Sequence, residues 1–221
     1  VARMAALLAG LPVTIPGNTV NRLCASGLQA IMDGTRQIMC GDAEMIIACG
    51  VESMTRAPFV IGKSETPFDR SSEMFDTTMG WRFINNNLSA MHYPFGMGET
   101  AENVAKKWNI GRQEQDEFAF ASQQKYAAAK AANKWDDEIA AVELNNKGMI
   151  SWIVYDEHPR ATSLEKLGTL KPAFIKNGTV TAGNSSGIND GSAAMLLASE
   201  EAVKKYNLSP LAKVTSMAVA G

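Results

Sequence analysis

Apolar runs of helical and of strand character alternate over the N-terminal part of the chain. Residues 1–9 repeat apolar side chains at helical spacing, and Gly10 stands where a helix commonly ends. Residues 12–20 predict extended backbone broken by turns, and residues 25–39, rich in Ala, Leu, Ile and Met, predict a second helix. The continuous apolar run over residues 44–49 is typical of a strand buried on both faces of a parallel sheet. Strand, helix and strand in this order indicate a layered α/β core.

From about Val51 the pattern becomes irregular, with prolines and a run of asparagines among Met and aromatic residues. A loop of such length inside a compact domain is usually functional or disordered. Two helices are then predicted, over residues 99–107 and 113–134, and the second ends in an Ala-rich stretch.

The remaining pattern predicts strands at 139–144 and 149–154, a short helix at 163–167 capped by Thr162 or Ser163, a glycine-rich turn at 180–187, a strand at 193–197, a helix at 200–206 and a last strand at 212–220. The dipeptide Asn189–Asp190 is interpreted as a turn and packing device before the strand, rather than as a catalytic pair. The chain contains no internal repeat and no low-complexity tract.

Composition narrows the functional class. Of the 221 residues 46% are hydrophobic and 20% charged, as in ordinary globular proteins of one or two domains. The formal net charge of −2 gives no reason to expect nucleic acid as a partner. We expect neither a membrane span nor a signal peptide, and the three cysteines favour a reducing compartment, the cytoplasm. Val1 opens inside an apolar helical pattern and Gly221 closes an apolar run, so we expect a truncated chain.

Cys24 is the strongest candidate for chemistry. It lies at a predicted strand-to-helix turn, where the positive end of the helix dipole favours the nucleophilic thiolate. The small residues 25–27 leave room for a substrate. The competing interpretation is a buried structural cysteine, because free cysteines are among the most buried residues. That interpretation is preferred for Cys40 and for Cys49, which falls in the predicted buried strand.

Four segments of the chain resemble the thiolase family in sequence, order and spacing. They are NRLCASG at residues 21–27, GDAEMIIACGVESMTRAP at 41–58, MGETAENVA at 97–105 and GTVTAGNSSGINDGSAA at 178–194. Two further stretches are most similar to the degradative 3-oxoacyl-CoA and 3-oxoadipyl-CoA thiolases, which are acetyl-CoA acyltransferases. These are DTTMGWRF at 76–83 and DEHPRATSLEKL at 156–167.

The resemblance implies a thiolase-like layered α/β/α core, present as a partial N-terminal domain at residues 1–51 and 178–211. An inserted α+β loop domain would occupy residues 52–177, and residues 212–221 would begin the C-terminal domain. The family's catalytic His (in Gly-His-Pro) and second catalytic Cys (in Cys-x-Gly-Gly-Gly) belong to segments that do not occur here. We therefore expect part of a thiolase that is inactive alone.

The resemblance also implies site residues. Cys24 would attack a 3-oxoacyl-CoA, release acetyl-CoA and pass the acyl group to CoA, or run the reverse condensation. Met97 would line the pantetheine tunnel and Ser186 would contact the pantetheine arm, so we expect all three residues to converge on one cleft. His92 and His158 lack the family's histidine setting and are interpreted as surface residues.

The implied partners are acyl-CoA and CoA, the latter as substrate with no further cofactor and no metal. A homo-oligomer, dimer or tetramer, is also implied. Two alternatives stay open: a 3-oxoacyl synthase of the same fold, and a non-catalytic acyl-CoA-binding or assembly module. The intact surroundings of Cys24 argue against the module, because a protein that lost its chemistry has no need of the nucleophile.

Overall fold

The computed structural model describes residues 1–64 and 66–220, which form two compact units. The first unit comprises residues 1–56 together with those from Asn189 onward, and the second comprises Ala57–Ile188. The sequence predicted the insertion at 52–177. Its identity with the loop domain of thiolases stays a prediction.

The first unit contains the helices α1 (Ala2–Leu8), α2 (Ser26–Met39) and α7 (Glu200–Lys205), the short 3₁₀ helix η1 (Met54–Arg56), and the strands β1 (Met45–Glu52) and β6 (Gly191–Ala198). These bounds confirm the three predicted helices to within one or two residues. Gly10 ends α1 as expected, since its φ of 78° is left-handed and its amide donates to the carbonyl of Leu7.

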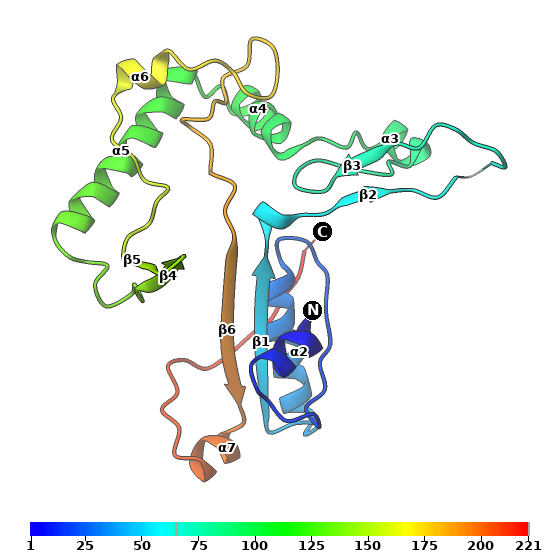
Figure 1. Cartoon of the computed structure of the whole chain (residues 1–221), viewed down its shortest axis with the longest axis vertical. Helices are drawn as coiled ribbons and strands as arrows, with labels where there is room; N and C mark the ends of the chain where they lie inside the picture. Colours follow the sequence, from blue (N-terminus) through cyan, green and yellow to red (C-terminus); the bar gives the residue numbers. More distant parts are fainter. Residues whose placement is uncertain (65, 221) are drawn as a thin grey trace. The chain divides into compact units, whose positions relative to one another are not determined.

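Strands β1 and β6 form an antiparallel pair, with Met45 opposite Ala198 and Glu52 opposite Gly191 (Figure 1). The predicted parallel sheet is therefore wrong. An apolar run predicts that a strand is buried, but it does not predict the direction of the neighbouring strand. That direction depends on where the connecting chain returns to the sheet. Here the whole second unit lies between the strands in sequence, and the chain comes back at the end of β1 that it left.

Helix α2 packs along β1, and Gly34 sets the closeness of that contact. A Cβ at Gly34 would lie 3.0 Å from Cδ1 of Leu197 and 3.1 Å from Cγ2 of Ile46. The core of this unit is small; its buried apolar side chains are Met32, Ala48, Leu197 and Ala202.

The other face of the β1–β6 pair is open among the residues described. On it Ile47, Val51 and Leu196 are 50%, 60% and 53% exposed, and Cys49 is exposed as well. Burial of β1 on both faces, and of Cys49 with it, was a wrong prediction. A sheet needs a layer on each side to be fully buried.

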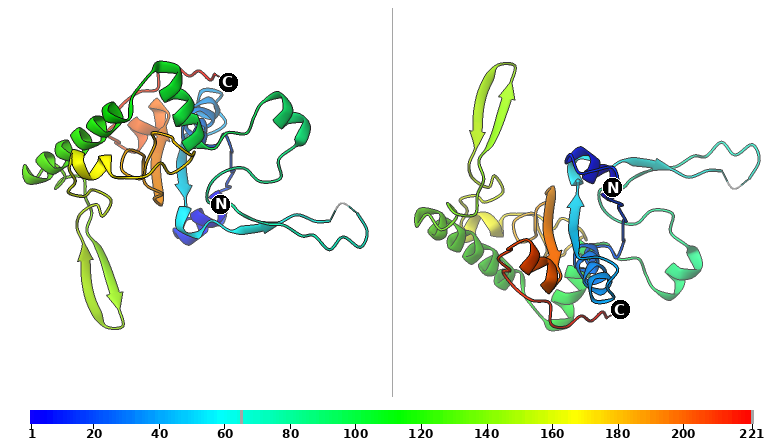
Figure 2. Two further views of the ribbon diagram at one scale, coloured as in Figure 1. Left: turned by 90° about the horizontal axis from the view of Figure 1, so that it is seen from above. Right: turned by 90° about the horizontal axis from the view of Figure 1, so that it is seen from below.

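The second unit contains the helices α3 (Asn86–Met91), α4 (Met97–Trp108), α5 (Arg112–Ala131) and α6 (Leu164–Gly168), and the strands β2 (Phe59–Ile61), β3 (Met74–Asp76), β4 (Val142–Asn146) and β5 (Met149–Ile153). The predictions of α4, α5, α6 and the strands β4 and β5 are confirmed. Ser163 caps α6 by accepting from the amide of Lys166. Figure 2 shows β4 and β5 as a hairpin.

Two predictions for less regular segments need correction. The irregular segment after Val51 contains the antiparallel pair β2–β3 and helix α3, which the sequence pattern did not indicate. The strand expected at 212–220 does not form over the described residues of that range. A strand needs a ladder partner for its backbone groups, and an apolar run alone does not supply one.

Helix α5, with 20 residues, is the longest helix of the described chain, and its sequence is polar and Ala-rich. None of the helices formed by residues 1–64 and 66–220 is both long enough and apolar enough to cross a membrane.

Candidate functional site

The turn that carries Cys24 is held by the side chains on either side of it. Oδ1 of Asn21 accepts from the amide of Leu23 at 2.9 Å, and Oγ of Ser26 accepts from the amide of Arg22 at 2.8 Å. The same hydroxyl donates to the carbonyl of Leu23 at 2.6 Å. Leu23 is left-handed, with φ of 49°, which costs a non-glycine residue on the order of 1 kcal/mol or more. These bonds offset that cost and fix the backbone into Cys24.

Cys24 directly precedes Ala25, the N-cap of α2, and it is exposed. The first turn of α2 lies against β1, because a Cβ at Gly50 would be 3.7 Å from Cα of Gly27. Local sequence therefore explains both the position of the thiol at a helix start and its access to a reagent. All three cysteines are exposed, so exposure does not single Cys24 out; its position does.

Met97 is the first residue of α4, and the residue is 77% exposed. The carboxylate of Glu99 accepts from the amide of Gly96 at 2.9 Å and so caps this helix. Gly98 is buried, and a Cβ there would lie 2.1 Å from Cγ of Phe174. The turn carrying Met97 is thus packed onto Phe174 on one side and open on the other.

Ser186 is exposed and follows a turn centred on Thr181, which is fully buried. Oδ1 of Asn184 accepts from the amide of Thr181 at 2.7 Å, and Oγ of Ser185 donates to the Thr181 carbonyl at 2.6 Å. Gly183 serves packing: a Cβ there would lie 2.5 Å from Cδ1 of Leu170. The space beside this glycine is therefore filled by the chain itself.

Glu102 is a residue that the sequence did not mark. It lies on α4, is 8% exposed, and accepts from the amides of Thr179 and Val180, each at 2.8 Å. The hydroxyl of Thr179 donates to it at 3.0 Å. Burial raises the pKa of Glu102, but the hydrogen bonds from Val180 and Thr179 outweigh it and hold the pKa below its ordinary value. Its partners lie 77 and 78 positions along the chain, beyond any local pattern.

Asp116, on α5, is a second buried carboxylate, 4% exposed. It accepts from Nε of Arg112 at 2.8 Å and from Nδ2 of Asn184 at 2.9 Å. Arg112 also donates to the carbonyl of Leu167, at the end of α6. Asp116 thus joins α5 to the turn before Ser186.

Asp190 belongs to the first unit and binds Thr55. Its carboxylate accepts from the amide of Thr55 at 2.9 Å and from its hydroxyl at 2.6 Å. The Thr55 hydroxyl, followed by the Thr55 amide, lowers the pKa of Asp190. Asp190 therefore makes a packing contact with Thr55, as interpreted, but neither Asn189 nor Asp190 forms a turn.

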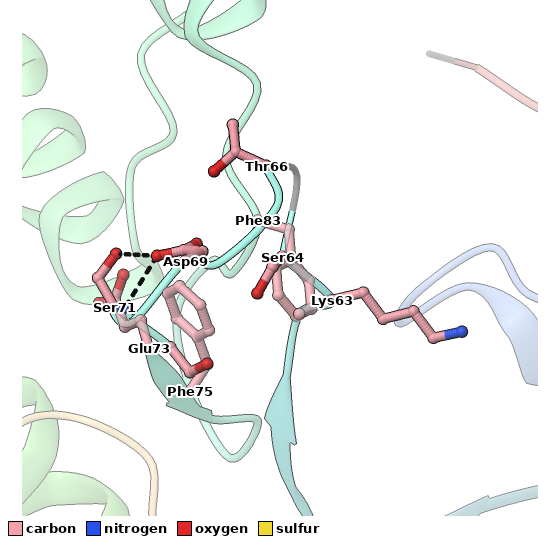
Figure 3. Close-up of a pocket in the computed structure, with 10 residues that line it drawn as sticks. Lys63, Ser64, Thr66, Asp69, Ser71, Glu73, Phe75 and Phe83 are labelled. Atoms are coloured by element: carbon pink, nitrogen blue, oxygen red, sulfur yellow. Dashed lines mark hydrogen bonds between the residues drawn. The ribbon is translucent and has the colours of Figure 1, made fainter.

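Neither of two open hollows in the described structure includes a predicted site residue. One, of about 440 Å³, is lined by Val51, Glu52, Ser53, Asp190, Gly191 and Ser192. The other, of about 320 Å³, lies between the arms of the β2–β3 segment (Figure 3). In it Asp69 accepts from the amide and hydroxyl of Ser71, and the rings of Phe75 and Phe83 meet edge to face at 5.0 Å.

The predicted site residues are distributed over the two units: Cys24 belongs to the first, and Met97 and Ser186 belong to the second. Their convergence on one cleft stays a prediction. His92 and His158 are exposed, as the surface interpretation required. Among residues 1–64 and 66–220, no three His, Cys, Asp or Glu side chains are grouped to hold a metal ion.

Known proteins match this chain over its whole length. The sequence profile of the thiolase N-terminal domain matches residues 1–201. The beta-ketoadipyl-CoA thiolase of Acinetobacter baylyi is 54% identical, and the 3-oxoadipyl-CoA/3-oxo-5,6-dehydrosuberyl-CoA thiolase of Escherichia coli K12 is 51% identical. Both alignments cover 100% of this chain and 56% of the relative, so the chain spans little more than half the length of either enzyme.

Solved structures agree with the sequence matches. Human mitochondrial 3-ketoacyl-CoA thiolase superposes with a TM-score of 0.80 at 40% identity, over 95% of this chain and 52% of that one. The same human enzyme in complex with CoA gives a TM-score of 0.78. The predicted fold class, a layered α/β thiolase N-terminal domain, is confirmed. The chain belongs to the thiolase family, through the N-terminal domain of that family.

Proposed function

We propose that the protein carrying this chain is a thiolase in activity, an acetyl-CoA C-acyltransferase that cleaves 3-oxoacyl-CoA with CoA, or runs the reverse condensation. The observation that carries the proposal is Cys24, exposed at the start of α2 on a turn that its neighbours hold rigid. Relatives named as thiolases at 51–54% identity over the whole chain support it.

The proposed reaction has two steps. The Cys24 thiolate attacks the 3-keto carbon, the bond between the α and β carbons breaks, and its electron pair leaves on the acetyl-CoA enolate. A proton completes acetyl-CoA, while the acyl group stays on sulfur. The CoA thiol then gives up its proton, attacks the thioester and frees Cys24. A base and an acid are required, and the resemblance assigns both to segments outside these 221 residues.

Met97 and Ser186 are proposed to hold the pantetheine arm of CoA beside Cys24. Support comes from their exposure on anchored backbone: Met97 begins a capped helix, and Ser186 leaves a buried turn. A thioester on a long arm gains much of its reactivity from being held in place, which a rigid support provides. CoA is a substrate in this scheme, and no further cofactor is proposed.

For the substrate we propose a 3-oxoacyl-CoA of the 3-oxoadipyl type, whose acyl chain ends in a free carboxylate. The names of two relatives that align with the whole chain support this class. The proposed partners are therefore acyl-CoA and CoA, within a cytoplasmic homo-oligomer, dimer or tetramer. Higher kcat/KM for 3-oxoadipyl-CoA than for acetoacetyl-CoA is the expected result, and the reverse order would contradict the substrate class.

The test of the function is trapping of the acyl-enzyme in the full-length protein. Incubation with 3-oxoadipyl-CoA without CoA should add one acyl mass to Cys24, and Cys24→Ala should abolish both the adduct and thiolysis. Cys49→Ala is the matched control, since Cys49 is also exposed but lies within β1. Binding of acyl-CoA with no adduct would instead favour the non-catalytic module. Condensation accompanied by loss of CO2 from one of the two thioesters would favour a decarboxylating synthase.

A further inference from the structure

The buried polar side chains of the second unit all converge on one short piece of backbone. Among residues 1–64 and 66–220, the polar or charged residues that are buried are Glu102, Asp116 and Thr181. Glu102 comes from α4 and Asp116 from α5, and Thr181 belongs to the turn before Ser186. Three side chains from three elements therefore meet in a single network over residues 179–185, called here the clamp.

Side chains hold several polar groups of the clamp backbone. Glu102 accepts from the amides of Thr179 and Val180, and Asn184 accepts from the amide of Thr181. Asn184 also donates to the carbonyl of Thr179 at 3.1 Å and to Asp116 at 2.9 Å. The segment thus acquires a fixed path without belonging to a helix or a strand of the fold.

If its only role were to stabilise the fold, this network would be inefficient, because burying a carboxylate carries a large desolvation cost. A buried carboxylate loses its hydration and recovers the loss only if several hydrogen bonds replace it. Well-packed apolar side chains often stabilise as much as a buried charge does. The two carboxylates instead contribute directional hydrogen bonds, each of which fixes the orientation of the particular group that donates to it.

We infer that Glu102 and Asp116 are positioning residues for CoA, which hold the clamp so that Ser186 meets the pantetheine arm. The inference rests on the proposed function, because it takes Ser186 as the CoA contact. Ser186 is the first residue beyond the clamp, and Ser185 is tied back to Thr181. Glu102 also lies on the helix that begins at Met97, so one carboxylate links both proposed CoA contacts.

The experiment measures CoA in the full-length protein carrying Glu102→Gln. An amide at this position presents N–H groups to the amides of Thr179 and Val180, so it cannot replace all the bonds. We expect the Kd for CoA, by calorimetry, and the KM for CoA in thiolysis to rise about tenfold, or about 1.4 kcal/mol. The rate of Cys24 alkylation by iodoacetamide, a reagent with no pantetheine arm, should change by less than about twofold.

A double-mutant cycle with Ser186→Ala tests whether Glu102 acts through Ser186. If it does, Glu102→Gln added to Ser186→Ala should weaken CoA binding little further. Additive effects, an unchanged Kd in Glu102→Gln, or equal losses in CoA binding and in Cys24 alkylation would each overturn the inference. Glu117→Gln is the matched control, because Glu117 neighbours Asp116 on α5 but is exposed.

Thr179→Val provides a milder variant if Glu102→Gln does not fold. It removes the hydroxyl that donates to Glu102 and accepts from Gln115, and it leaves both amide bonds to Glu102 in place. A rise of about threefold in the Kd for CoA supports the inference, and no change contradicts it. If the wild-type protein binds CoA but does not catalyse thiolysis, the proposed function is refuted. In that case the Kd values for CoA still test whether the clamp positions Ser186. Wild-type protein that does not bind CoA would refute both.

Discussion

Helix α2 carries one cysteine near each end, which separates the effect of the helix dipole from the effect of exposure. Cys24 precedes the N-cap, and Cys40 is the C-cap. Both are exposed, as is Cys49 in β1. The partial positive charge at the start of a helix stabilises an anion, and the partial negative charge at its end destabilises one. The two exposed thiols therefore lie at opposite ends of one helix dipole.

Limiting iodoacetamide at neutral pH should therefore modify Cys24 first and Cys40 last. The dipole contributes about 0.3–1 kcal/mol near a helix end, which corresponds to about a two- to fivefold ratio at each end. Peptide mapping by mass spectrometry measures the order, and Cys49, outside any helix, is the internal reference. Modification of Cys49 before Cys24 would show that the site assignment is wrong.

Glu102 should make the stability of the second unit depend on pH. Burial raises its pKa, yet the bonds from Val180 and Thr179 lower it by more, so the folded pKa lies below the unfolded value of 4.5. The stabilisation is therefore complete above about pH 5 and is lost as pH falls through the folded pKa. Wild type should exceed Glu102→Gln in unfolding free energy by about 1–3 kcal/mol at pH 7.

Urea unfolding of both proteins from pH 7 downward measures this difference. It should stay constant above pH 5 and shrink below the unfolded pKa of Glu102, 4.5. Glu117→Gln, at an exposed position of α5, should follow the wild type throughout. A difference that is the same at every pH would mean that the Glu102 charge does not stabilise the fold.

At the residue scale, the sequence predicts the position of a residue when the contacts that hold it come from nearby in the chain. Cys24 could be placed because Asn21, Ser26 and the helix start all lie within a few positions of it. The roles of Glu102 and Asp116 could not be predicted, because in the sequence each is simply a charged residue within a helix. Their hydrogen-bond partners lie 77 and 68 positions away along the chain. The packing role of Gly183 could not be predicted for the same reason, because it depends on the Leu170 side chain that fills the space beside it.

At the element scale, α4 depends on a glycine. A Cβ at Gly98 would meet the ring of Phe174 at 2.1 Å, whereas a Cβ at Gly168, in α6, would meet no atom within 4 Å. Overpacking costs about 1–3 kcal/mol, and the gain in helix propensity from Gly to Ala is about 1 kcal/mol. Replacing Gly98 and Gly168 by Ala should therefore change the free energy of unfolding in opposite directions.

Gly98→Ala should lower the free energy of unfolding by about 1–2 kcal/mol, and Gly168→Ala should raise it by up to about 1 kcal/mol. Chemical denaturation followed by circular dichroism measures both. Equal effects of the two substitutions would show that Phe174 does not constrain α4.

Helices were predicted well from the sequence, and strands less well, for a physical reason. A helix satisfies its backbone within one segment, so its pattern and caps are local, as at Ser163 and Gly10. A strand is completed by a distant partner. The run at 44–49 gave a strand but not its antiparallel neighbour β6, and the similar run at 212–220 forms no strand among the described residues.

At the scale of the whole molecule, the 221 residues alone should show no thiolysis. Cys24 supplies a nucleophile, but covalent catalysis also needs a base and an acid, and His92 and His158 are exposed in a setting unlike that of the family's catalytic histidine. The open face of β1–β6, with Ile47, Val51 and Leu196, should also promote self-association.

The assay follows loss of Mg-enolate absorbance when acetoacetyl-CoA or 3-oxoadipyl-CoA is mixed with CoA and the purified chain. The full-length protein is the positive control. Turnover by the chain that disappears in Cys24→Ala would show that these residues contain their own acid and base, contrary to the proposal.

The bond between Thr55 and Asp190 has a consequence for how the chain tolerates change. It joins residues 135 positions apart, beside the terminal pair Glu52–Gly191 of the β1–β6 ribbon. In polymer terms, β1 and β6 are the arms of a hairpin whose connecting loop is the entire second unit. The entropy of closing a loop grows only with the logarithm of its length, about 0.6 kcal/mol for each doubling. Insertions or deletions within the second unit should therefore leave the strand register, and the turn of Cys24 that packs on it, nearly unchanged.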